Sequence, residues 1–380
     1  MQVKIINNIE EFNGLEPAWN EALAKSGSDN FFLRHEWLAS WWQYYGQGNE
    51  LFVVLLLDEG TIIAAAPLMI KHSRFHFRSL RFIAYEVTDY NDFIAIREPE
   101  ECFKLISAEI LRQHQRWDML DLYFLREDSP HFTYWTKYFK DVDGVFGKQK
   151  NVDASVVIDL NKYGSWEEYF NKLSKKTRDD IKRQLNRLNK LGRISFDRTR
   201  TKEAGIQLFR EFIAKHQARW HELSQASQFS DPTLVNKYLA LIDKLAGNGL
   251  LDLSCLKLDG VPIAFHFGYV YNRCFFYYTP AFDPRYAAYS PGKILLKYLM
   301  ENSFRDKLMI FDLLRGTEKY KLVWGDGLVR LFRLRSYQWK AKGLILCLAY
   351  EIFDGYRKIK EYMKNGAIGR KVTKLLRLKI

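Results

Sequence analysis

The sequence predicts an α/β protein whose two halves share one plan, and two hairpins are the main evidence. Residues 51–70 and 251–270 each read as an apolar strand, a turn and a second apolar strand. The turns contain Asp58-Glu59-Gly60 and Asp259-Gly260, and Asp-Gly between apolar runs is typical of a hairpin because Gly accepts a positive φ. A helical segment that contains Trp and His precedes each hairpin. These matches favour an internal duplication, and chance repetition of a common motif is the alternative.

A strand–loop–helix unit near residue 290 is the second observation. The apolar strand CFFYYTP leads into a loop that ends in Ser290-Pro291-Gly292-Lys293, and an amphipathic helix follows. The first N–H groups of a helix have no intrahelical partner, and the helix dipole favours an anion there. Pro291 suits a first helical turn, Gly292 permits close approach of a ligand, and Lys293 adds a positive charge. The unit predicts a phosphate-binding site, with an ordinary helix start as the alternative.

Length and composition indicate a globular protein of two domains. The chain has 380 residues, of which 47% are hydrophobic and 16% aromatic, and single domains rarely grow so long. We expect domains at 1–150 and 151–340, followed by a tail at 341–380. Residues 1–12 contain no apolar segment of the secretory type, and the four cysteines show no CxxC spacing. A cytoplasmic protein without a metal or a disulfide framework is therefore expected.

Positive charge is concentrated at the C-terminal end. The net charge is +13, and residues 340–380 alone contain 11 Lys or Arg against 3 Asp or Glu. The mildly basic remainder argues against DNA binding. The tail reads as a basic amphipathic helix that packs on the body or contacts an anionic membrane surface or a partner. Contact of the tail with a membrane would make the protein a peripheral protein at the inner membrane face.

The segment 165–192 reads as one long amphipathic helix. Ser165 and Glu168 form a capping box, and Gly192 ends the helix. One face is apolar and the opposite face is basic. The basic face is either a solvated surface or a contact for a large anionic substrate through Lys175, Lys176, Arg178 and Arg183.

Three segments resemble the GNAT acyltransferase superfamily, most closely its FemAB-like and CelD/BcsL-like branch. They are FIAKHQARW at 212–220, PIAFHFGYVYNRCFFYYTPAFDPRYAAYSPGKILL at 262–296 and FDLLRGTEKYKLVWG at 311–325. The resemblance covers 160–335 well and 30–100 more weakly. It implies two tandem GNAT-like domains, with mixed, mostly antiparallel sheets flanked by helices. The Gly-rich Q/R-x-x-G-x-G/A loop of GNAT proteins is reduced here to Pro-Gly-Lys, and the first half shows no Pro-Gly helix start.

The resemblance and the strand pattern together nominate catalytic residues. Asp312 and Glu318 fall where GNAT folds carry reactive groups. Asp312 follows apolar residues of a strand, so burial should raise its pKa and suit it as a base; a structural ion pair is the alternative. His266 shares a strand face with Ala264 and Gly268, which leaves room for a ligand, and a structural histidine is its alternative.

Further residues are candidates for substrate binding. Asp283 is either a turn clasp with Arg285 or a group that positions an acceptor amine. The whole set is His216, Arg219, Trp220, Tyr278, Asp283, Tyr320 and Lys321.

The first hypothesis is an N- or O-acyltransferase. Acyl-CoA, such as acetyl-CoA, would donate directly to an amine or hydroxyl of a sugar, an amino acid or a cell-envelope precursor, as in exopolysaccharide synthesis. The alternatives are a FemAB-like peptidyl transferase that uses aminoacyl-tRNA, and a non-catalytic scaffold of envelope polysaccharide synthesis. No nucleophile elbow, HExxH, Walker loop or GxGxxG occurs in the sequence, which excludes the enzyme classes that these motifs define.

Overall fold

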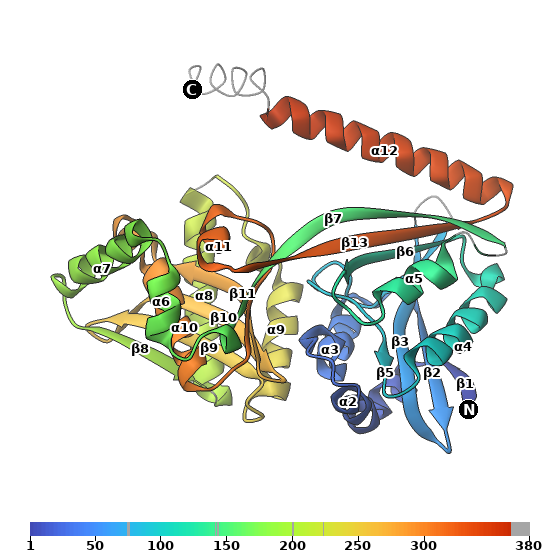
Figure 1. Ribbon diagram of the computed structural model, residues 1–380, viewed down its shortest axis with the longest axis horizontal. Coiled ribbons are helices and arrows are strands. Elements are labelled where there is room, and N and C mark those ends of the chain that lie inside the picture. Colours follow the sequence, from blue (N-terminus) through green and yellow to red (C-terminus); the bar gives the residue numbers. More distant parts are fainter. Residues whose placement is uncertain (74–76, 141, 143, 200, 223, 366–380) are drawn as a thin grey trace.

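One thirteen-stranded mixed sheet runs through both halves of the computed structural model (Figure 1). The structure describes residues 1–365 apart from 74–76, 141, 143, 200 and 223. The strand order is β1-β2-β3-β4-β6-β13-β7-β12-β11-β10-β9-β8, and β5 pairs with β3 beside this path. Helices flank the sheet, so the predicted α/β class with mostly antiparallel pairing is confirmed.

The N-terminal half begins at β1 and ends with the long strand β7. Its elements are β1 (Gln2–Ile6), α1 (Ile9–Gly14), α2 (Glu16–Lys25), η1 (Phe31–Leu33), α3 (His35–Tyr45), β2 (Asn49–Asp58), β3 (Thr61–His72), β4 (Arg78–Phe82), β5 (Ile94–Ala95), α4 (Pro99–Arg112), η2 (His114–Arg116), β6 (Met119–Arg126), α5 (Phe132–Phe139) and β7 (Val145–Asp159).

The C-terminal half repeats this plan and ends with a second long strand, β13. Its elements are η3 (Leu160–Lys162), α6 (Trp166–Lys172), α7 (Lys175–Asn189), β8 (Ile194–Thr199), α8 (Lys202–Glu222), η4 (Gln228–Ser230), α9 (Pro232–Leu245), β9 (Leu251–Leu258), β10 (Val261–Tyr271), β11 (Cys274–Phe282), η5 (Pro284–Tyr289), α10 (Pro291–Arg305), β12 (Ile310–Arg315), α11 (Lys319–Trp324) and β13 (Gly327–Gln338), and α12 (Ala341–Asn365) follows.

The two halves exchange their last strands. In each half a parallel pair, β4 with β6 or β11 with β12, lies beside the hairpin strands. The next strand in the sequence then crosses over: β7 pairs with β12 of the other half, and β13 pairs with β6. The crossing strands pair with each other from Gly327↔Val157 to Gln338↔Val145, and Figure 1 shows them bridging the halves. The predicted duplication is thus present as two copies of one topology joined by strand exchange.

Both predicted hairpins form, and their turns have the expected conformation. Glu59 and Gly60 have φ values of 48° and 80°, and Asp259 and Gly260 have 48° and 81°. Positive φ at two successive residues matches the right-handed twist of the flanking strands.

The segment 165–192 is two helices, not the predicted one. Helix α6 ends where Leu173 turns to an extended conformation, and Ser174 caps α7 by accepting a hydrogen bond from the Thr177 N–H at 3.2 Å. The predicted cap of the first helix is confirmed, because Ser165 accepts from Glu168. A continuous periodic pattern hid the break, since Ser174 can act as a cap as well as an interior residue. The strand expected at 154–160 is the longer β7, which crosses the expected boundary at residue 150.

Three large hydrophobic clusters and one small one hold the described sheet and its helices. Of the large clusters, one lies mainly in each half and the third joins the halves; the small one packs α12 on the sheet. In the third cluster, Phe31 stacks on Tyr269 with ring centroids 4.0 Å apart, and helix α3 packs on α9. Aromatic burial of this kind is a large stabilising contribution. It therefore holds the two halves together in addition to the exchanged strands.

Asp312 is a second contact between the halves. Its Oδ1 accepts hydrogen bonds from the Tyr90 hydroxyl at 2.8 Å and from the Leu314 N–H at 2.7 Å. Leu314 has a φ of 61° inside a bulge of β12, a costly conformation for Leu that this hydrogen bond supports. The side chain of Asp312 is buried, and Arg126 of the other half lies 3.8 Å from Oδ2.

Burial raises the pKa of Asp312 to about 6, although Arg126 acts in the opposite direction. The unfolded chain has a pKa of about 3.9, so the folded state binds the proton more tightly. The free energy of unfolding should therefore fall as the pH rises from about 4 to about 6, by about 3 kcal/mol from this group. Asp312→Asn keeps the accepting oxygen and removes the titration. Urea unfolding across this pH range measures the free energy of unfolding of the wild type and of the variant. The difference between the two should change with pH, and a constant difference would contradict the raised pKa of Asp312.

Candidate functional site

The site lies at the carboxyl ends of β11 and β12. These parallel strands pair only from Cys274↔Ile310 to Phe276↔Asp312, and their later residues pair with other strands. Ligands of open α/β sheets bind at the carboxyl ends of strands, where neighbouring strands separate. Helices α10 and α11 begin at this end, so they bring the Ser290 and Glu318 regions to one place.

The start of α10 has an unusual backbone. Ser290 has φ 52° and ψ 50°, and its side chain makes no capping hydrogen bond within the described structure. The next residue is Pro291, so the first N–H of the helix comes from Gly292. A Cβ at Gly292 would have only Phe282 Cδ1 within 4 Å, at 3.6 Å. The backbone at Gly292 is therefore not crowded by neighbouring side chains, and the predicted phosphate site at this turn stays a prediction.

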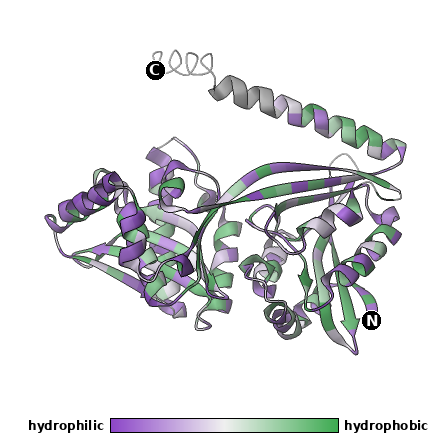
Figure 2. Cartoon of the chain, in the orientation of Figure 1, coloured by the Kyte–Doolittle hydropathy of each residue, from purple (hydrophilic) through white to green (hydrophobic). Residues whose placement is uncertain are grey.

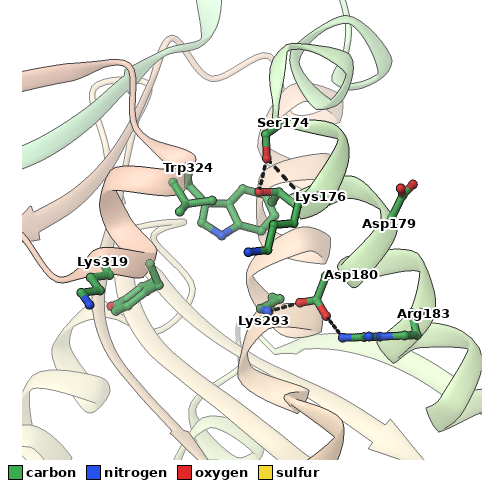
Figure 3. Close-up of a pocket in the computed structure, with 11 residues that line it drawn as sticks. Ser174, Lys176, Asp179, Asp180, Arg183, Lys293, Lys319 and Trp324 are labelled. Atoms are coloured by element: carbon green, nitrogen blue, oxygen red, sulfur yellow. Dashed lines mark hydrogen bonds and ion pairs between the residues drawn. The ribbon is translucent and has the colours of Figure 1, made fainter.

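A pocket of about 740 Å³ lies beside this helix start (Figure 3). Helix α7, the first turn of α10 and helix α11 form its walls. Its lining residues are Ser174, Lys176, Thr177, Asp179, Asp180, Arg183, Lys293, Lys319, Tyr320, Val323 and Trp324. The four cations outnumber the two carboxylates, and the beginning of α7 adds a second helix N-terminus. Both features favour an anionic ligand.

Lys293 and Arg183 share one carboxylate. Asp180 forms an ion pair with Arg183 within α7 and another with Lys293 of α10 (Figure 3). The hydrogen bond from Lys293 lowers the pKa of Asp180, so the carboxylate is ionised near neutral pH. An incoming phosphate would compete with this carboxylate for the same two cations.

Two tyrosines hold the pocket walls together. The Tyr169 hydroxyl donates to the Trp324 carbonyl at 2.5 Å, and the Tyr163 hydroxyl donates to Asp326 Oδ2 at 2.9 Å. These bonds fasten α6 and the segment before it to the end of α11. Of the joined segments, only α11 lines the pocket, so these bonds hold the α11 wall in place.

The N-terminal half has the same helix start with the opposite charge. Helix α4 begins at Pro99, and the preceding Glu98 has φ 44° and ψ 55°, close to the values of Ser290. Glu100 and Glu101 occupy the first turn, where α10 has Gly292 and Lys293. The predicted lack of a Pro-Gly start in this half is correct, but a Pro start is present. Its carboxylates would repel a phosphate.

Tyr320 is a predicted residue that the structure brings into the pocket together with Lys293. Glu318 is the N-cap residue of α11 and lies two positions before Tyr320. Lys321 lies behind this helix start: its Nζ is 3.1 Å from Glu318 Oε2 and donates to the Arg315 carbonyl at 2.5 Å. Glu318 is thus next to the pocket and keeps a largely exposed side chain.

Asp283 and Arg219 frame the loop before α10. Asp283 accepts from the N–H and the guanidinium of Arg285, and Lys215 donates to its Oδ2 at 2.7 Å. These bonds match the predicted turn clasp. The Arg219 guanidinium lies over the Phe282 ring at 4.4 Å, so it stabilises the end of β11.

His216 and Trp220 are bonded to each other away from the pocket. The Trp220 indole donates to His216 Nε2 at 3.1 Å. Nδ1 must therefore carry the proton and donate to Ser227 Oγ at 2.8 Å. Burial lowers the pKa of His216 to about 4, so the ring is neutral and satisfied.

The other predicted residues also lie outside this pocket. His266 is buried between packed rings, 4.9 Å from the Tyr277 centroid, and its Nδ1 is 3.3 Å from Asp252 Oδ1. The predicted space beside it is filled, since Gly268 leaves room for the imidazole itself. The Tyr278 hydroxyl is bonded to the Tyr238 hydroxyl and to the Val87 carbonyl. Asp312 occupies the inter-half contact described above.

Sequence reasoning missed the wall that α7 contributes. Lys176 and Arg183 were candidates for substrate contact, but Ser174, Thr177 and Asp180 were not. The sequence Ser174-Lys-Lys-Thr177 could have indicated that a separate helix begins here, because Ser is strongly preferred at the N-cap.

Comparison with known proteins gives a domain match and a shared fold. Residues 175–322 match the family model of the acetyltransferase (GNAT) domain, and none of the curated proteins matches the sequence. The crystal structure of FemX is 13% identical with a TM-score of 0.59, covering 88% of this chain and 97% of that chain. The L-PGS of Bacillus licheniformis is 11% identical with a TM-score of 0.54, covering 88% and 94%.

A third solved structure is the C-terminal domain of a putative lysylphosphatidylglycerol synthetase from Agrobacterium fabrum. It is 11% identical with a TM-score of 0.54 and covers 90% of this chain and 95% of that chain. Identities of this size show a shared fold. Residues 175–322 are thus similar to a GNAT acetyltransferase domain, and the chain as a whole shares the fold of FemX.

Removal of the internal carboxylate should strengthen anion binding in the pocket. Asp180→Asn keeps the shape of the side chain and frees Lys293 and Arg183, so the dissociation constant for inorganic pyrophosphate should fall about fivefold at low salt. Calorimetric titration measures this change. Asp197→Asn, on the edge strand β8, is the matched control and should bind as the wild type does. Equal affinities in all three proteins would contradict the assignment of the pocket.

Proposed function

We propose that the protein is an acyltransferase whose donor binds with its phosphates at the start of α10. The observation that carries the proposal is the start of α10, where Lys293 lines a pocket of about 740 Å³ near the carboxyl ends of two separating strands; Ser290, Pro291 and Gly292 precede it in the same turn and do not line the pocket. Acyl-CoA fits this description because it combines a phosphate-rich end with an acyl thioester. The acceptor is an amine or hydroxyl of a sugar, an amino acid or a cell-envelope precursor.

Ser290, Pro291, Gly292 and Lys293 hold the donor phosphates in this proposal. The Gly292 N–H and the Lys293 ammonium supply the positive partners, and Arg183 supplies a third. Tyr320, Val323 and Trp324 give the pocket an apolar side, which suits the remainder of a thioester donor. The corresponding turn of the N-terminal half carries Glu100 and Glu101, so one donor binds per chain.

The proposed reaction is direct transfer in a ternary complex. The acceptor nitrogen or oxygen attacks the thioester carbonyl, its new bond to carbon forms, and the carbon–sulfur bond breaks. Glu318 takes the proton of the acceptor, and the Tyr320 hydroxyl donates a proton to the leaving thiolate. Glu318 is favoured over Asp312 and His266 because its carboxylate is exposed beside the pocket, whereas those two side chains are buried.

A second candidate is aminoacyl transfer from tRNA. The observation that favours it is the exposed basic surface of α7, which extends from the pocket wall through Lys175, Lys182 and Lys190, together with the fold shared with FemX. A tRNA bound along this helix would place the end that carries the amino acid at the pocket. Such binding would weaken steeply with salt, because several phosphates would be neutralised at once.

A substitution at Gly292 tests the donor site. Gly292→Asp puts a negative charge beside the helix start and should weaken acetyl-CoA binding at least about tenfold. Gly292→Ala is the matched control: its Cβ makes ordinary contact with Phe282, so its affinity should stay within about twofold of the wild type. Calorimetry gives the affinities, and thermal unfolding verifies that both variants fold.

The outcomes separate the three hypotheses. Binding of acetyl-CoA that only the Asp variant loses supports the acyltransferase. Binding of charged tRNA without acetyl-CoA binding would replace it with aminoacyl transfer. Binding of neither donor by the folded wild type would contradict both and favour a non-catalytic scaffold.

A further inference from the structure

An exposed apolar stripe runs along the outer face of α12. Ile345, Leu348, Ile352 and Tyr356 follow one another at spacings of three or four residues and are between 61 and 73% exposed. This spacing puts them on one face of a helix. Trp339, immediately before the helix, is 62% exposed as well. Figure 2 shows the concentration of hydrophobic residues in this part of α12.

The inner face of α12 is already packed on the protein. Leu346 is buried in a cluster with Met119 and Tyr337, and the Arg335 guanidinium lies 4.1 Å from the Tyr350 ring centroid. The helix is therefore anchored over the exchanged strands (Figure 1). Its outer stripe is the face that no described part of the chain covers.

The charges around the stripe identify what could cover it. Glu351 pairs with Lys148 at 3.3 Å, and Asp354 pairs with Lys150 and Arg335. Both acidic residues of α12 whose side chains the structure describes are thus paired with basic residues of the sheet. In the sequence, residues 357–380 then contain nine Lys or Arg and one Glu. An apolar stripe that is followed in the sequence by a strongly basic segment complements an anionic lipid surface. It would repel a second copy of this chain.

We propose that α12 docks the protein on a membrane that contains anionic phospholipids. The helix lies in the plane of the interface, with Ile345, Leu348 and Ile352 entering the acyl region and Trp339 at the level of the headgroups. None of the described helices is long and apolar enough to span a bilayer. The proposal does not depend on which donor the pocket takes.

Sedimentation with vesicles tests this surface. The full chain should bind vesicles of phosphatidylglycerol and phosphatidylcholine and should bind pure phosphatidylcholine vesicles weakly. The triple variant Ile345→Gln, Leu348→Gln, Ile352→Gln should lose affinity at least about tenfold. The matched control carries the same change at exposed residues elsewhere, Leu191→Gln, Val261→Gln and Leu328→Gln, and should bind as the wild type does.

Salt and oligomeric state complete the test. Raising the salt concentration should weaken wild-type binding, because the basic residues are then screened. Equal binding by the triple variant and the wild type, or no binding by the wild type, would overturn the proposal. A wild-type dimer that the triple variant converts to a monomer, with no vesicle binding, would assign the stripe to a second copy instead.

Discussion

The antiparallel pairing of β7 with β13 is the constraint on which the rest of the structure depends. Each strand completes the sheet of the other half, and the buried pair of Arg333 on β13 with Asp121 on β6 secures the exchange at one end. Two of the pocket walls lie beside these strands in the sequence: α7 follows β7 by way of α6, and α11 precedes β13. Tyr169 and Tyr163 form hydrogen bonds from the segment after β7 to the segment before β13. The strand exchange therefore brings α7 and α11 to the same side of α10.

The two copies have kept one backbone and diverged in charge. Asp121 and Asp312 occupy the third position of corresponding strands, and both are buried. Burial alone would raise the pKa of each, but Arg333 and Arg81 hold the pKa of Asp121 below its usual range, whereas that of Asp312 is raised. The helix starts differ likewise, with Glu100 and Glu101 in one copy and Gly292 and Lys293 in the other. The start of α10 thus carries a positive charge where the start of α4 carries two negative ones.

The sequence predicted the fold class, the duplication and the helix start of α10, because each depends on local patterns. Asp-Gly turns, alternating apolar runs and a Pro-Gly helix start are readable within about ten residues. The strand exchange is a contact between residues almost 200 positions apart, so no local pattern reports it. The split of the helix at Ser174 was hidden because the apolar periodicity continues across it.

The candidate site was predicted less completely than the fold, for a related reason. Lys293 and Tyr320, predicted separately as donor-binding and substrate-binding residues, both line the pocket. His266, Tyr278 and Asp312 carry the right chemical groups but lie in packed layers, where stacking and hydrogen bonds occupy them. A strand pattern tells which face a side chain occupies, but not whether neighbouring rings fill the space there. Asp312 shows this well: the direction of its pKa follows from its apolar strand, and its partner Tyr90 belongs to the other half.

The central claim is that one donor molecule binds per chain, at the start of α10. A crystal structure of the protein with desulfo-CoA, a donor analogue without the reactive sulfur, would test it most directly. The account predicts a single bound molecule whose phosphates contact the Gly292 N–H and the Lys293 side chain. Phosphates bound at α4 of the N-terminal half, or at a surface away from α10, would contradict it.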